Sequence, residues 1–548
     1  MIRIITLCFL CALNLCFSQE KAPSSKRIDS LFNFINNDGP GISIGIVKDG
    51  NLIYSYQKGL SNLEYEIPIS SKTVFGLASI TKQMTAACIG VLIQNGKLSV
   101  NDDVRTYIPE LPNYGPAIKI KHLLNHTSGL RNHNVLLDLQ GFDYEHMGYT
   151  NESVQKLIFS QNGVNNLPGE KMLYTNSNYV LLALIVERVS GKKIDAFAKK
   201  ELFEPLGMKH TFFKSSLEQI IKNKANSYYK KSNEYVQTKS LTHCIGAGGV
   251  GSTIEDMAKW SNLFTVKTPE LPYLPKFIST LDTLNNGDLL KYARGVFVSP
   301  YKNQKTINHS GRDLGMRSQL ICLPEANLSV IIFTNSEHIN VVDLSYKVLD
   351  LFITSSEEEQ QNKELYTHSK TELFKFTGDY QEINSDLGMK ILFENDTLKA
   401  KSSFGRTPIP LKEDGKHQFH RAQNSSVRYH FFNDESSMCD LAIDFGGAKF
   451  YFERVQLENS DAVNLNDYIG EYYSDEISVT YQVFIENQKL FLRLPNNPKI
   501  ELILGQKNEF GSGKRTRYIF KRDKSKAINS FTVASEGTVK DILFQKIN

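Results

Sequence analysis

Alternation of apolar and polar residues predicts strands near both ends of the first two thirds of the chain. The pattern covers residues 41–48, 51–59, 318–324 and 327–335. Asp49-Gly50, between the first two of these segments, is typical of a hairpin turn. Helical spacing of apolar residues is found at 26–37, 79–94, 179–191 and 339–353. We therefore expect an α/β (α+β) domain over residues 26–353, with an antiparallel sheet built from both ends of the domain, flanked by helices and joined to a helical lobe.

The pattern of apolar and polar residues changes after residue 353. Residues 354–364 are polar and lack an apolar period, which predicts a linker reaching to residue 370. Short alternating strands follow, and they contain a repeat: Gly378-Asp379-Tyr380 recurs 92 residues later as Gly470-Glu471-Tyr472. The repeat predicts two related all-β domains, at 371–456 and 463–548, each a small barrel or sandwich. Coincidence among strands rich in Phe and Tyr is the alternative.

The amino terminus has the pattern of a signal peptide. Arg3 precedes a short apolar run from Ile4 to Leu15, and small residues near Ser18 suit cleavage before Gln19. The pattern predicts a signal peptide at 1–18 and an exported, periplasmic or extracellular protein with no transmembrane segment after cleavage. A retained anchor is disfavoured because the apolar run is too short. A lipid on Cys16 is disfavoured because Leu15 is bulky.

The composition of the chain limits the classes of binding partner that we expect. The 548 residues have a formal net charge of +4 without a long block of one sign, which argues against nucleic acid and against an anionic membrane surface. Cys88, Cys244, Cys322 and Cys439 remain after signal cleavage, too few and too dispersed for a disulfide framework. The histidines show no HExxH and no ligand spacing on one helix, so we expect neither a metal nor a cofactor. The oligomeric state is left open.

The clearest chemical signal is Ser79-Ile80-Thr81-Lys82. The pattern places Ser79 at the first turn of a helix that ends near Asn95-Gly96, with Lys82 on the same face. A lysine amine within hydrogen-bond reach can accept the serine proton if its pKa is lowered. The same spacing recurs at Ser153/Lys156, Ser190/Lys193 and Ser227/Lys230. Only the Ser79 copy follows a strand-like segment and opens a long apolar helix.

Two further segments carry polar groups of the right kind. Tyr174 and Asn176 stand just before a helical pattern and could bring a phenol and an amide to a cleft. The alternative is that Asn176 caps the helix and Tyr174 packs. His309 and Gly311 precede a predicted strand, and the backbone amide of Arg312 could serve as an oxyanion donor. Taken alone, that segment favours an ordinary turn with a surface histidine.

Together these motifs resemble a known family. The order S-x-x-K, Y-x-N and [K/H]-x-G is similar to the signatures of serine β-lactamase-like hydrolases, which include class C β-lactamases, penicillin-binding DD-peptidases, D-aminopeptidases and esterases. Segments at 96–112, 118–130 and 246–260 resemble the same family. The resemblance implies that Ser79 is the nucleophile, Lys82 its base, Tyr174 a second proton carrier and Asn176 a substrate ligand. His309, Gly311 and Arg312 would line the opposite wall, and the turn at 126–129 would be structural.

One departure bears on the substrate. Most β-lactamases and DD-peptidases of the family carry lysine where His309 stands, whereas a histidine is mostly neutral at pH 7. Histidine resembles the D-aminopeptidase branch, whose members also have two β domains, and Arg312 could compensate as a cation. We therefore expect a serine hydrolase acting on D-amino-acid peptides or amides through an acyl enzyme. The alternatives are a broad esterase, a β-lactamase, and a catalytically silent module that binds cell wall or a partner.

Overall fold

The computed structural model describes residues 23–353 and, with internal gaps, 366–547. The gaps within the second part are 384–386, 404–406, 423, 433–438, 446–448, 457–462, 497 and 514. The predicted signal peptide at 1–18 and the linker segment at 354–364 therefore lie outside the described residues. Within the described residues, no helix has the length and apolar character needed to cross a membrane.

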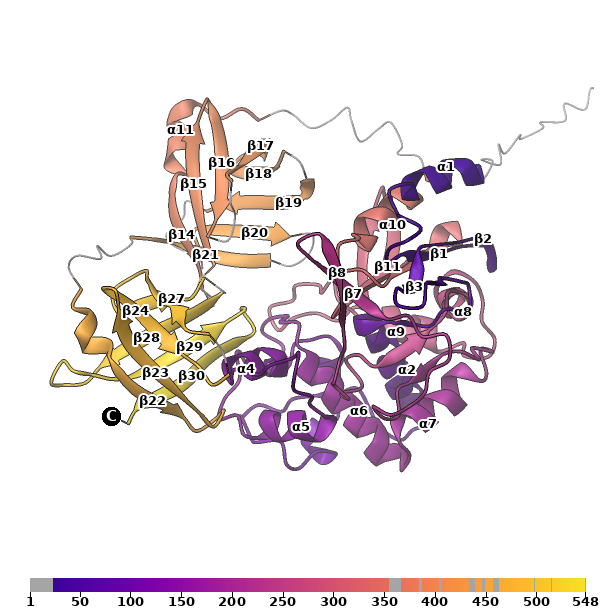
Figure 1. The fold of residues 1–548 in the computed structure, drawn as a ribbon, viewed down its shortest axis with the longest axis horizontal. Coiled ribbons are helices and arrows are strands. Elements are labelled where there is room, and N and C mark those ends of the chain that lie inside the picture. The colour runs from indigo at the N-terminus through magenta and orange to yellow at the C-terminus, as the bar shows by residue number, and fades with distance from the viewer. Residues whose placement is uncertain are drawn as a thin grey trace, which may run out of the picture.

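A six-stranded antiparallel sheet organises the first part, in the order β10-β11-β12-β13-β1-β2. Its strands β1, β2 and β11 are labelled in Figure 1. Its strands are β1 (Ile42–Lys48), β2 (Asn51–Lys58), β10 (Phe297–Tyr301), β11 (Gln304–Asp313), β12 (Met316–Leu323) and β13 (Leu328–Thr334). Strand β1 pairs on one side with β2 and on the other with β13, which comes from the far end of the domain. The prediction of an antiparallel sheet with strands from both ends of the chain segment is confirmed.

Helices cover both faces of this sheet, and a helical lobe stands beside it. The helices of the first part are α1 (Ser25–Asp29), α2 (Thr81–Gln94), α3 (Ile120–Leu124), α4 (His133–Leu139), α5 (Asn151–Phe159), α6 (Asn176–Ser190), α7 (Ile194–Ala198), α8 (Ile254–Thr265), α9 (Leu274–Ser279) and α10 (Val341–Leu349). Side chains of β1 that include Ile44 pack with α10, whereas Gly45 faces α8 so closely that a Cβ there would lie 2.7 Å from Ile254. A glycine in this strand therefore lets α8 approach the sheet.

Small sheets connect the lobe to the main sheet. They are formed by β3 (Leu60–Asn62) with β4 (Ile67–Pro68), by β5 (Phe75–Gly76), β6 (Phe212–Phe213) and β9 (Val250–Ser252), and by β7 (Ser227–Lys231) with β8 (Glu234–Thr238). Strand β9 lies between β5 and β6 and brings the glycine-rich segment at 246–251 beside the start of α2. This juxtaposition decides what surrounds Ser79.

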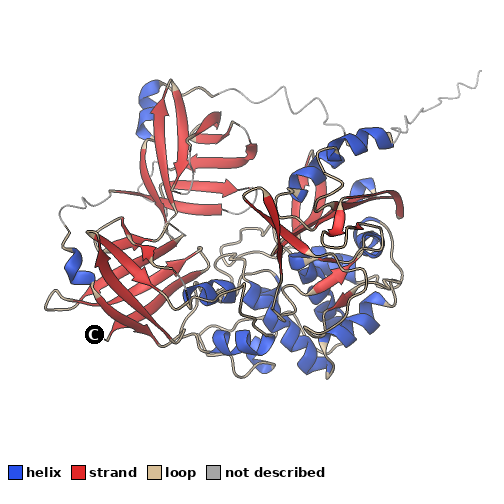
Figure 2. Cartoon of the chain, in the orientation of Figure 1, coloured by secondary structure: helices blue, strands red, loops and turns tan. Residues whose placement is uncertain are grey.

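The remainder of the chain is almost entirely strands, as Figure 2 shows. After α11 (Lys370–Lys375), a closed barrel is formed by β14 (Gly378–Glu382), β15 (Gly388–Glu394), β16 (Thr397–Ser402), β17 (Ile409–Gly415), β18 (Gln418–Arg421), β19 (Asn424–Phe431), β20 (Leu441–Phe445) and β21 (Lys449–Val455). A nine-stranded sheet follows, formed by β22 (Gly470–Ser474), β23 (Val479–Glu486), β24 (Lys489–Arg493), β25 (Ile500–Glu501), β26 (Ile503–Leu504), β27 (Glu509–Gly511), β28 (Thr516–Arg522), β29 (Ile528–Ser535) and β30 (Val539–Lys546). The expected pair of barrel-like β domains is present.

The two β domains begin in the same way, as their sequence repeat predicts. Gly378 and Gly470 open β14 and β22, with φ of 149° and 151°. Two residues later, the buried Tyr380 and Tyr472 each donate a hydrogen bond, 2.8 Å long, to the carbonyl four residues back in the chain. The repeated Gly-x-Tyr therefore marks the first strand of each β domain, which is held in both by the same tyrosine hydrogen bond.

The second β domain packs directly against the helical lobe. Apolar residues of α4 and α5, including Leu136 and Leu139, share one core with the interior of this domain. Glu476 forms an ion pair with Arg131, and both side chains are buried, at 7% and 3% exposure. Glu476 also accepts a hydrogen bond of 2.9 Å from the amide of Asn162. The contact joins parts of the chain more than 300 residues apart and is built like a domain interior.

Replacing Glu476 with Ala should release this interface. The substitution leaves the Arg131 guanidinium buried without its partner, a change that typically costs about 3–5 kcal/mol of stability. The matched control is Glu486→Ala on the same β domain, whose partner Lys499 is 43% exposed, so about 1 kcal/mol or less should be lost. Thermal unfolding and limited proteolysis of the full chain measure both. Equal destabilisation by the two substitutions would contradict the interface described here.

Candidate active site

Ser79 stands where a tight turn enters a buried helix. A 3-10 turn, η2 (Ala78–Ile80), runs directly into α2, and Ala78 has a φ of 47°, a conformation that residues other than glycine rarely adopt. The amide of Ile80 donates to the carbonyl of Leu77 over 3.2 Å. Ser79 is partly exposed at this turn, whereas its neighbours Ala78 and Ile80 are buried. The turn therefore presents the hydroxyl outward from a rigid base.

Lys82 lies one helical turn further on and is completely buried. Its Nζ is 3.0 Å from Ser79 Oγ and 2.9 Å from the carbonyl oxygen of Ala247. Among the described residues, no carboxylate forms an ion pair with Lys82, and burial lowers its pKa to about 7. A substantial share of the amine is then unprotonated near neutral pH and able to accept a proton.

The ring of Tyr174 lies next to the buried amine of Lys82. The centre of its ring is 4.9 Å from Lys82 Nζ, and its hydroxyl is near enough to Ser79 for that side chain to affect the pKa of the phenol. Desolvation raises the pKa of the phenol well above its ordinary value, so Tyr174 stays protonated. Hydroxyl, amine and phenol thus form one connected group, although they come from segments almost 100 residues apart.

His126 fixes the backbone on both sides of Tyr174. The carbonyl of His126 accepts from the amide of Leu173 over 2.9 Å, and its Nδ1 accepts from the amide of Thr175 over 3.3 Å. The two rings lie 4.3 Å apart, centre to centre. Burial holds the pKa of His126 far below its ordinary value, so the imidazole is neutral and can accept. The turn that the sequence marks only as structural brackets both neighbours of Tyr174.

Asn176 begins α6 beside this group. Its Nδ2 donates to Oδ1 of Asn134 on α4 over 2.7 Å, and its Oδ1 is buried without a partner among the described residues. Capping of α6 is performed by Thr175, whose Oγ1 accepts from the amide of Ser177, so the alternative of Asn176 as a cap is not what the structure shows. Because this oxygen is buried, a ligand could reach it only if a neighbouring side chain moved.

His309 faces the same group from β11. Its Nδ1 is 2.6 Å from the carbonyl oxygen of Ser310, and its Nε2 is 3.3 Å from the hydroxyl of Tyr292. Burial, reinforced by the nearby Lys82, lowers the pKa of His309 to about 3. The imidazole is therefore neutral, with Nδ1 donating and Nε2 accepting, and it supplies no positive charge.

Gly311 follows on the same face of β11, pressed against the turn that carries Ser79. A Cβ at this position would lie 2.3 Å from the carbonyl oxygen of Leu77 and 2.2 Å from Oγ of Ser318. The side chain of Ser318 itself donates to that carbonyl over 2.7 Å. A glycine is required here for the strand to lie against the turn, a stronger reason than room for a substrate.

Arg312 is not brought into this group by its side chain. Alternation along β11 directs it to the face opposite that of His309 and Gly311, where it is exposed and lies across from Arg317. Among the contacts of the described residues, none joins its guanidinium to Ser79, Lys82 or Tyr174. Only its backbone can take part at the site.

Several residues that contribute to the site carry no motif of their own. Ala247 lies in the glycine-rich loop, whose glycines signal a tight turn but not the carbonyl that binds Lys82. Asp313 comes two residues after Gly311 on the same face of β11; its side chain is exposed, yet surrounding protein raises its pKa. One of its oxygens accepts from the amide of Leu314 over 2.8 Å. Alternation along the strand could have indicated Asp313, but nothing local indicates Ala247.

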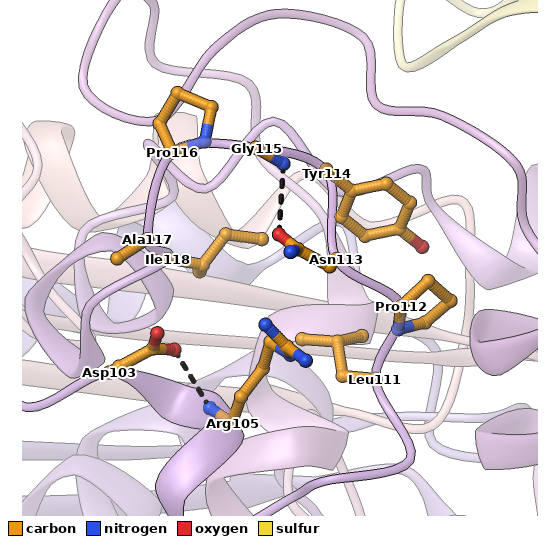
Figure 3. A pocket seen from close by; sticks show the side chains of 10 residues that line it. All are labelled: Asp103, Arg105, Leu111, Pro112, Asn113, Tyr114, Gly115, Pro116, Ala117 and Ile118. Carbon is orange, nitrogen blue, oxygen red and sulfur yellow. Dashed lines mark hydrogen bonds between the residues drawn. The ribbon is translucent and has the colours of Figure 1, made fainter.

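Another surface hollow is separate from the group of residues around Ser79. Figure 3 shows a surface hollow lined by residues of 103–118, in which Asp103 binds the amide of Arg105 and Asn113 that of Gly115. None of its lining residues belongs to the group around Ser79. Within the described part of the chain, no group of three or more His, Cys, Asp or Glu side chains is placed to hold a metal ion.

The chain belongs to the beta-lactamase family, whose model matches residues 29–352. A penicillin-binding protein of Bacillus subtilis (strain 168) is 29% identical over 318 residues, which are 53% of this chain and 66% of that protein. A D-aminopeptidase of Brucella anthropi is 21% identical over 458 residues, 83% of each chain. The chain spans slightly under two thirds of the first relatives that it matches.

Solved structures share the fold over a longer stretch. An octameric penicillin-binding protein homologue from Pyrococcus abyssi superposes with a TM-score of 0.53 at 22% identity, covering 83% of this chain and 94% of its own. A structure described as SurE superposes with a TM-score of 0.54 at 17% identity, covering 78% of this chain and 98% of its own. At these identities the likeness concerns the fold alone.

Replacing Gly311 with Ala should damage the site without unfolding the protein. The added methyl group must displace either β11 or the turn carrying Ser79, and a shift of about 1 Å at a reacting group can cost about 100-fold in rate. Reaction of Ser79 with a fluorophosphonate should slow by about that factor. The matched control is Gly76→Ala, where nothing lies within 4 Å of the new methyl group. Unchanged labelling in Gly311→Ala would contradict the close contact.

Proposed function

We propose that this protein is an exported hydrolase that acylates Ser79 and cleaves amides of D-amino acids. The observation that carries the proposal is the buried Lys82 amine, with a pKa lowered to about 7, 3.0 Å from Ser79 Oγ. A lysine held in this way matches a general base for a serine nucleophile. Export is supported by the signal-like pattern of the amino terminus alone.

The reaction follows from the groups present. Ser79 Oγ attacks the substrate carbonyl carbon while its proton passes to Lys82 Nζ, and the negative charge that develops on the carbonyl oxygen is met by the backbone amides of Ser79 and Arg312. The bond to the leaving amine then breaks as that amine takes a proton from Lys82 by way of the Tyr174 hydroxyl. A water molecule then gives a proton to the Lys82 amine and attacks the ester carbonyl carbon. The ester bond breaks, Ser79 takes the proton back from Lys82, and the free acid is released.

The charges around the site favour substrates with an ammonium group. His309 is neutral, so it recognises a carboxylate weakly, and the side chain of Arg312 points away. Asp313 instead offers an exposed carboxyl on the site face of β11. Amides and peptides with a free amino-terminal D residue fit this arrangement, and relatives named D-aminopeptidase are consistent with it. Esters rank second and β-lactams third.

A substrate panel tests the proposal. D-alanine p-nitroanilide should be cleaved faster than its L enantiomer and faster than a chromogenic cephalosporin, because of the amine preference. Ser79→Ala should lower every activity by about 1,000-fold or more, since the nucleophile is gone. Ser190→Ala is the matched control, because Ser190 has the same spacing to a lysine but lies at the far end of α6. It should change nothing.

The outcomes separate the alternatives. Faster hydrolysis of p-nitrophenyl esters than of any amide would indicate an esterase, and fastest hydrolysis of the cephalosporin a β-lactamase. Absence of turnover, together with absence of a covalent adduct on Ser79 by mass spectrometry, would contradict the enzymatic proposal and favour a binding module.

A further inference from the structure

A hollow lies where the second β domain meets the loop that leads to Tyr174. It is shallow, with a volume of about 20 Å³, and it is lined by Asn165, Asn166, Lys171, Leu173, Gly537 and Lys540. The first four residues come from the catalytic domain, and the last two from the turn before β30 and from β30 itself. Neither domain forms this hollow alone.

The β domain is fixed in register at this place. Asn165 donates from Nδ2 to the carbonyl of Thr538 over 2.7 Å and accepts from the amide of Lys540 over 3.0 Å. The amide of Asn132 donates to the same carbonyl over 3.2 Å. These bonds hold the backbone of Lys540 against the catalytic domain, so the position of this lysine is set by the fold.

The lining of the hollow is positive. Lys171 and Lys540 both face it, and among the described residues neither forms an ion pair. No Asp or Glu is found among the lining residues. Two ammonium groups sharing one hollow repel each other, and an anion bound between them would remove that repulsion.

The hollow is close to the reacting groups. Leu173 precedes Tyr174 in the chain, so their Cα atoms are about 3.8 Å apart, and the Cα of Lys171 is within about 11 Å of that of Tyr174. The hollow therefore adjoins the loop that carries Tyr174, and an extended peptide of two or three residues spans about 7–10 Å.

We propose that the hollow is a subsite for the carboxylate of a peptide substrate, with Lys171 and Lys540 as its cations. This inference rests on the proposed function and adds to it: the second β domain selects short peptides that end in a free carboxyl group. It assigns to Lys171 and Lys540 the charge that His309 does not supply.

Binding to a full-length Ser79→Ala protein tests the subsite without any need for turnover. D-alanyl-D-alanine and its carboxy-terminal amide differ only in the charge of that end. By titration calorimetry, the acid should bind about tenfold more tightly than the amide, and the difference should disappear when Lys171→Gln and Lys540→Gln are added together. Lys521→Gln, an exposed lysine on the same β domain, is the matched control and should preserve the difference.

Equal affinity for acid and amide, or a preference that survives the double substitution, would overturn the subsite. Fluorophosphonate labelling of the same lysine variants carrying an intact Ser79 should remain at the parent rate, because neither lysine touches the reacting atoms. If Ser79 is not labelled in the parent protein, the proposed function fails, whereas the binding comparison still decides the subsite on its own.

Discussion

The contact between the buried amine of Lys82 and the hydroxyl of Ser79 is the constraint on which the rest of the site depends. An ammonium ion enclosed by protein loses its hydration, and among the described residues no carboxylate compensates it. The amine therefore gives up its proton readily, and the groups that contact it include the serine, the carbonyl of Ala247 and the faces of the Tyr174 and Tyr179 rings. A nearby acidic group would raise the pKa and abolish the base.

The fold satisfies this constraint by bringing together four distant segments. The turn η2 and the helix α2 that follows it carry the serine and the lysine, the loop before α6 carries the phenol, the glycine-rich loop before β9 supplies the carbonyl, and β11 forms the opposite wall. His126 and Gly311 are less visible parts of the same arrangement, since one fixes the backbone on both sides of Tyr174 and the other allows β11 to touch the nucleophile turn. The second β domain, clamped by the pair Arg131 and Glu476, supports the helices next to this group.

Much of the fold could be predicted because it depends on the spacing of apolar residues within short segments of the chain. Alternation at 41–59 and 318–335 predicts the central sheet, and the repeated Gly-x-Tyr predicts two similar β domains. The S-x-x-K motif could be chosen among four copies only through its neighbours. What the sequence could not indicate are contacts between distant segments: the carbonyl of Ala247 on Lys82, the bonds of His126 to both neighbours of Tyr174, and the docking of the second β domain on α4. Those depend on how packed elements meet, for which no local pattern exists.

The most direct test of the account is the pH dependence of the reaction of Ser79 with a neutral fluorophosphonate. Only the unprotonated amine can act as base, so the second-order rate constant should rise about tenfold per pH unit below the pKa and level off above it. With the Lys82 pKa lowered to about 7, the midpoint should lie near pH 7. A rate that is flat from pH 5 to 9, or one that rises only above pH 9, would contradict a neutral buried lysine beside the nucleophile.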